Sequence, residues 1–146
     1  MPGLLIETGK PFAMIGGGGI PADSTGKLYN GVAVGSTTGI DTMLYNECLI
    51  TIQTGLHAAG YKADLIASAD TTATNGSVIG TFGTLANSSM YTAYVWAVGQ
   101  PRYLFLRTDG TTAAGFPAEI VASAVLATAD RPATDASASV SFAILK

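Results

Sequence analysis

The chain has 146 residues, a net charge of −3 at pH 7, and charged side chains at only 12% of its positions. Its seven lysines and arginines are scattered, so the sequence lacks the basic cluster that phosphate-driven nucleic-acid binding needs. No apolar run approaches the ~18 residues of a membrane span, and one cysteine cannot form an internal disulfide, so we expect a reduced, soluble, intracellularly made protein without nucleic-acid or membrane partners.

Residues 1–27 differ in character from the rest of the chain. Gly3–Thr8 is long enough for one short strand, whereas Gly16–Gly19 and Pro21 interrupt any regular element. The large apolar side chains flanking this glycine run are Leu4, Leu5, Ile6, Phe12, Met14 and Ile15. Such a segment cannot build its own core, so we expect an extended arm, jointed at Gly16–Gly19, in which these six residues contact a neighbouring subunit or another protein. Packing of the arm on its own domain is the alternative.

From Leu28 onward, short alternating segments recur at a spacing of ~10 residues, which is typical of a β-sandwich, jelly roll or barrel. The expected strands are Leu28–Val34, Glu47–Gln53, Tyr61–Ala67, Ser77–Leu85, Tyr91–Val98, Arg102–Thr108, Glu119–Leu126 and Val140–Ile144. Asn30-Gly31, Asn75-Gly76 and Asp109-Gly110 are predicted turns. The sequence therefore predicts an all-β chain, with a jelly-roll-like antiparallel β-sandwich over residues 28–146 after the extended N-terminal arm of residues 1–27.

Alternation also predicts which side chains point inward. One face of each strand should carry Cys48, Ile50 and Ile52; Tyr61, Ala63 and Leu65; and Ile120, Ala122, Ala124 and Leu126. Tyr103 and Phe105 should share one face of their strand, opposite Leu104 and Leu106. We expect Tyr91, Tyr94, Trp96, Tyr103 and Phe105 to form a packed cluster across neighbouring strands; carbohydrate stacking or contact with a partner is the alternative reading.

Residues capable of bond chemistry are few. His57 and Cys48 are the only histidine and cysteine, and a nucleophile–base site also needs an orienting group and an oxyanion pocket. Gly16–Gly19 lacks the spacing of a phosphate-binding loop, and Asp64, Asp70, Asp130 and Asp135 do not form the D-x-D-x-D-G pattern of a calcium loop. We therefore expect a non-enzymatic protein with no catalytic, cofactor-binding or metal-binding residues.

Three stretches carry a resemblance to a known family: Glu47–Thr54 (ECLITIQT), Gly80–Phe82 and above all Gln100–Asp109 (QPRYLFLRTD). Together with the Thr/Gly/Ala loop that follows and a final strand that ends in ATADRPA, they resemble the capsid cement (decoration) proteins of tailed bacteriophages over residues 40–133. The arm and the last strand, Val140–Leu145, depart from that family's pattern.

The resemblance implies a jelly-roll-like virion protein, made in the host cytoplasm, that binds the outer capsid surface. Its expected partner is the major capsid protein, whose subunits it would bridge and thereby stabilise, and it is expected to form a homo-oligomer, either a dimer or a trimer. The alternative, from another functional class, is a carbohydrate- or receptor-binding β-module of a phage tail or fibre that uses the Tyr/Trp cluster.

Overall fold

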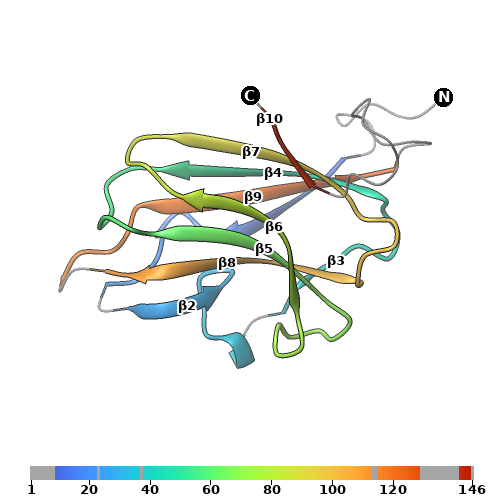
Figure 1. Ribbon diagram of the computed structural model, residues 1–146, viewed down its shortest axis with the longest axis horizontal. Helices are drawn as coiled ribbons and strands as arrows, with labels where there is room; N and C mark the ends of the chain where they lie inside the picture. The colour runs from blue at the N-terminus through green and yellow to red at the C-terminus, as the bar shows by residue number, and fades with distance from the viewer. Residues whose placement is uncertain (1–8, 23, 37, 113–114, 129–141, 146) are drawn as a thin grey trace.

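The computed structural model describes residues 9–22, 24–36, 38–112, 115–128 and 142–145. Within them the chain forms one 3₁₀ turn, η1 (Val34–Ser36), and ten strands that all pair antiparallel with their neighbours (Figure 1). The strands are β1 (Lys10–Ile15), β2 (Thr25–Tyr29), β3 (Ile40–Asp41), β4 (Glu47–Thr54), β5 (Lys62–Ser68), β6 (Ser77–Thr84), β7 (Met90–Trp96), β8 (Tyr103–Thr111), β9 (Ile120–Ala127) and β10 (Phe142–Leu145).

Two sheets form the sandwich. The first sheet has the order β1-β9-β4-β7-β10, and the second has the order β2-β8-β5-β6, with β3 also pairing with β8. The pairs β1–β9, β2–β8, β4–β7 and β5–β6 nest inside one another, as if one long hairpin had been rolled up, and successive pairs alternate between the sheets. Such paired Greek keys define the jelly roll, so the predicted fold class is confirmed.

The core lies between the two sheets and is built by period-two alternation. Cys48, Ile50 and Ile52 of β4 face it, as do the inward positions expected on β5 and β9. Ala93 and Val95 of β7 and Leu104 and Leu106 of β8 complete it from the two sheets. Six of its buried members are alanines, whose small side chains take up little space between the sheets.

A second cluster covers the outer face of the second sheet. Phe105 is fully buried there with Ile66 and Ala73, and Tyr29 and Tyr103 pack against them. The rings of Tyr29 and Phe105 meet edge to face, with centroids 6.5 Å apart. The predicted opposition of Tyr103 and Phe105 to the Leu104/Leu106 face is therefore confirmed.

The predicted arm is wrong where the structure describes it. β1 pairs with β9 at the edge of the first sheet, and β2 pairs with β8 in the second, so residues 10–15 and 25–27 belong to the sandwich. Met14 and Ile15 are only 4% and 3% exposed and lie in the core, so they are not available as partner contacts. The register of β1 shifts between Ala13 and Ile15, which turns two consecutive side chains inward.

Two further sequence predictions are corrected. Asp109-Gly110 is not a turn, because both residues lie within β8 and Gly110 faces Gly26 of β2. A Cβ at Gly110 would lie 2.6 Å from the Tyr61 ring, so the glycine makes room for this ring. The five-residue aromatic cluster does not form either, since β7 and β8 belong to different sheets. Asn30-Gly31, by contrast, is a turn with φ of 51° and 82°, as predicted.

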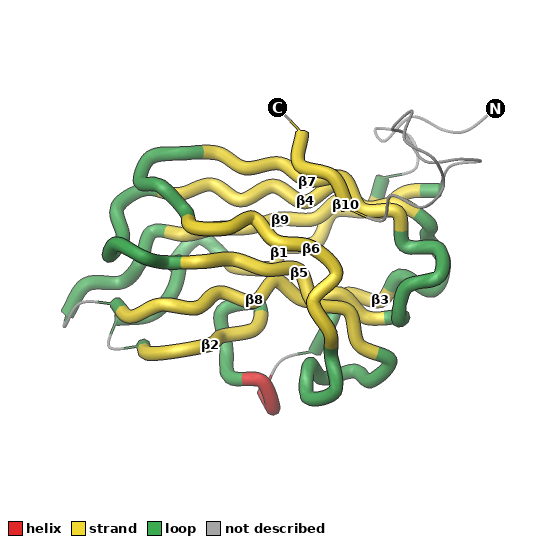
Figure 2. The backbone as a smooth tube through the Cα atoms, viewed as in Figure 1, coloured by secondary structure: helices red, strands yellow, loops and turns green. Residues whose placement is uncertain are grey.

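Loops gather at the two ends of the strands (Figure 2). We call one end the four-loop end, because it carries the β1–β2, β4–β5, β6–β7 and β8–β9 connections, residues 16–24, 55–61, 85–89 and 112–119. The opposite end carries the β3–β4, β5–β6 and β7–β8 connections. The alternation of strand directions in the roll thus brings four segments from across the chain to one place.

Replacement of Ile15 by Ala tests whether β1 belongs to the folded domain. Because Ile15 is buried in the core, we expect the free energy of unfolding in urea to fall by about 2–5 kcal/mol. Val34→Ala, at an exposed position of η1, is the matched control and should change it by less than about 0.5 kcal/mol. Equal urea midpoints for the two variants would show that this segment is a separate arm and not part of the folded domain.

A second prediction concerns acid stability. Asp64 loses solvent by burial, which raises its pKa, but hydrogen bonds from Thr81 and Arg107 outweigh this effect and hold the pKa below its ordinary value of 3.8. Its contribution to stability is therefore complete above that ordinary value and is lost as the pH falls through the lower, folded-state pKa. Thermal melts of Asp64→Asn between pH 7 and 2.5 should show a shallower acid decline than wild type; a parallel decline would contradict the assignment.

Candidate functional site

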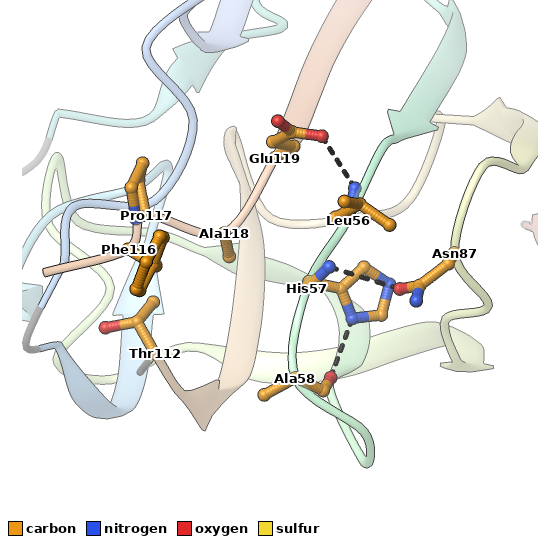
Figure 3. A pocket seen from close by; sticks show the side chains of 9 residues that line it. All are labelled: Leu56, His57, Ala58, Asn87, Thr112, Phe116, Pro117, Ala118 and Glu119. Atoms are coloured by element: carbon orange, nitrogen blue, oxygen red, sulfur yellow. Dashed lines mark hydrogen bonds between the residues drawn. The ribbon is translucent and has the colours of Figure 1, made fainter. Parts of the chain in front are cut away.

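The candidate site is a pocket of about 340 Å³ at the four-loop end. Figure 3 shows Phe116, Pro117 and Thr112 on one side of it and Leu56, His57 and Asn87 on the other. The lining residues come from the β4–β5, β6–β7 and β8–β9 loops. The pocket therefore exists only because the jelly roll places these loops side by side.

Hydrogen bonds hold the β4–β5 loop against both neighbouring loops. The Thr54 hydroxyl donates to the carbonyl of Ala86 at 2.6 Å and accepts from the Ser89 amide at 2.9 Å. The Leu56 amide donates to a carboxylate oxygen of Glu119 at 2.7 Å, and the His57 amide donates to Asn87 Oδ1 at 3.1 Å (Figure 3). The loop is thus fixed by side chains at the sandwich rim.

The β1–β2 and β8–β9 loops are fastened to each other in the same way. Ile20 and Ala118 exchange two backbone hydrogen bonds of 2.9 Å, and Ile20 is fully buried. Gly19, at φ +70°, allows this approach, since a Cβ there would lie 2.3 Å from the Ala118 carbonyl oxygen. The buried Thr112 hydroxyl accepts from the Ser24 amide at 2.7 Å. The glycine run therefore ends in a fixed turn at its last member.

Two of the side chains that line the pocket are apolar and exposed. Leu56 is 66% exposed and Phe116 is 71% exposed. Met90, at the start of β7, is exposed at the same end but does not line this pocket. Within the described residues of the four loops, Glu119 is the one charged side chain, and its carboxylate already accepts from the Leu56 amide. The described part of the four-loop end is consequently held by hydrogen bonds, rich in apolar groups and poor in charge, which is typical of the centre of a protein interface.

The opposite end differs in charge. Met43, Leu44 and Val98 are exposed there. Beside them, Arg102 donates two hydrogen bonds, of 2.8 and 2.6 Å, to the carboxylate of Asp41. The hydrogen bond from Arg102 is the main cause that lowers the pKa of Asp41 to about 2. This end therefore combines apolar groups with a solvated ion pair.

The one cysteine and the one histidine of the chain lie apart, and the cysteine is buried. Burial raises the pKa of the Cys48 thiol to about 12, so its nucleophilic thiolate does not form at neutral pH. Cys48 lies near the start of β4 and His57 follows its end, so about 20 Å of extended strand separates them. No cluster of three potential metal ligands occurs in the described part of the chain. Asp64 pairs with Arg107, Asp70 accepts from Asn75, and Asp130 and Asp135 lie outside the described residues.

The predicted contact residues do not gather in one surface. Met14 and Ile15 are core residues, Phe12 packs against the core, and Leu4, Leu5 and Ile6 lie outside the described residues. Trp96 and Tyr94 are buried, so neither presents an open ring face for stacking. Leu56 and Phe116 were missed; the signal was a large apolar side chain in each of two predicted loops, with Phe116 followed directly by a proline.

Replacement of Thr54 by Val tests how the site is held. The change keeps the shape of the side chain but leaves the Ala86 carbonyl and the Ser89 amide without their hydroxyl partner. We expect a loss of about 1–3 kcal/mol in the free energy of unfolding, together with faster amide exchange at Ser89. Thr84→Val, at an exposed position, serves as control; amide exchange at Ser89 as slow as in wild type would show that Thr54 does not hold the loops.

No helix among the described residues has the length and apolarity to cross a bilayer. Comparison of the chain with protein-family profiles, with curated proteins and with solved structures finds no significant match in any of the three.

Proposed function

We propose that this chain is a non-enzymatic structural protein of a bacteriophage virion, which binds the outside of the capsid and stabilises it by bridging major capsid protein subunits. The observation that carries this proposal is the four-loop end, where Leu56 and Phe116 flank a pocket in a surface with one charged side chain in its described loops. The choice of the major capsid protein as partner rests on the resemblance of residues 40–133 to capsid cement proteins.

The energetics of the surface support attachment by contact. Full burial of a Leu or Phe side chain is worth about 1.5–3 kcal/mol, and each tenfold change in affinity corresponds to about 1.4 kcal/mol. The loops are already fixed by hydrogen bonds, which Thr54 donates and which Thr112 and Asn87 accept. Little ordering entropy therefore opposes docking.

A glycan- or receptor-binding role is the second candidate, and the pocket itself favours it. His57 and Asn87 place polar groups beside the exposed Phe116 ring, a combination suited to the polar and apolar faces of a sugar. The Tyr94/Trp96 site expected from the sequence does not serve this role, because both rings are buried.

Binding to shells of the source phage, assembled without this chain, tests the first candidate. We expect wild-type protein to cosediment with the shells and to raise their melting temperature. Leu56→Asp/Phe116→Asp should weaken binding at least about tenfold, since two apolar contacts are replaced by charges that must lose water.

Leu44→Asp is the matched control, because Leu44 is 76% exposed at the opposite end, and it should bind as wild type does. Loss of binding by Leu44→Asp alone would move the contact to that end. Failure of wild-type protein to bind any shell would overturn the proposal; glycan-array binding that disappears in Asn87→Ala would then favour the receptor-binding role.

A further inference from the structure

Strand β10 lies outside the nested roll. The four nested pairs use β1, β2 and β4–β9, and none of these pairs includes β10. β10 adds four residues to the free edge of β7, from Phe142 opposite Val95 to Leu145 opposite Thr92. On its other edge, β7 pairs with β4 through all seven of its residues. The roll is thus complete without β10.

The connection to β10 is much longer than its path in one molecule requires. β9 ends at Ala127 and β10 begins at Phe142, so 14 residues join them. Both strand ends lie at the same end of the first sheet, and only β4 and β7 stand between them. Three inter-strand spacings amount to about 14 Å, whereas 14 extended residues reach about 46 Å.

The connection between β9 and β10, which we call the tether, has a polar sequence. Residues 128–141 read TADRPATDASASVS, in which Val140 is the only large aliphatic side chain. The strand at its end reads FAIL and is uncharged. A polar tether that carries a short apolar strand meets the requirements for adding a strand to the edge of another sheet.

We propose that β10 is exchanged between copies of this chain, so that the β10 of one copy pairs with β7 of a second copy in the register seen within one molecule. The contacts are the same in both arrangements, so the balance depends on the effective concentration of the tethered strand. Short linkers typically give effective concentrations in the mM range. In dilute solution the strand stays in its own molecule, and where copies are crowded it pairs with a neighbour. The inference concerns contacts between copies and is independent of capsid binding.

Disulfide trapping in the free protein tests the exchange. Thr92 and Leu145 face each other in register, a position at which paired cysteines on antiparallel strands lie within disulfide range. We expect Thr92→Cys/Leu145→Cys, oxidised at about 10 µM, to close mainly within one chain; at about 1 mM the share of disulfide-linked dimers should rise more than tenfold. A mixture of the two single variants, which can link only between chains, should also give dimers at the higher concentration.

Thr51→Cys/Thr92→Cys is the matched control. Thr51 faces Thr92 across β4 and β7 inside the roll, so its disulfide should close within one chain at both concentrations. Cys48 is buried and does not compete. Closure of the Thr92/Leu145 pair within one chain at every concentration would overturn the exchange, and so would failure of that pair to close at all while the control closes.

Discussion

The nested pairing of strands is the constraint on which the rest of this structure depends. The outermost pair joins residues 10–15 to residues 122–126, while the innermost pair, β5–β6, is a local hairpin. Each outer pair therefore closes a longer loop than the one inside it, and the entropy of that closure must be met by burial between the sheets. The same nesting brings the β1–β2 and β8–β9 loops together, where Ile20 and Ala118 form their bridge.

Period-two alternation was enough to predict most of the roll. β4, β7, β8 and β9 are long, and their inward residues follow one another at every second position. β1 was not predicted, because its six residues include Pro11 and because the register shift after Ala13 breaks the alternation. The turn predicted at Asp109-Gly110 was wrong for a different reason. Gly110 is needed to make room for the Tyr61 ring, and an Asp-Gly pair with this role looks the same in the sequence as one that forms a turn.

The candidate site could not be predicted from the sequence, because no local sequence pattern indicates that its residues lie together. Thr54, Asn87, Thr112 and Glu119 belong to different loops, and each looks like an ordinary polar loop residue. Only the order of strands places their hydroxyl, amide and carboxylate groups against the backbone of a neighbouring loop. The exposed Leu56 and Phe116 were visible as apolar side chains in predicted loops, but a single exposed apolar residue carries little information.

The low content of charged residues in this chain shapes the surface of the four-loop end. The described loops are held together by Thr, Asn and backbone groups and by one carboxylate, that of Glu119. A surface with few charges and with loops that are already fixed loses little on desolvation and little on ordering when a partner covers it. Cys48 is buried near the start of β4, and His57 lies in the loop that follows the end of this strand. The physical properties of this end therefore suit recognition by contact.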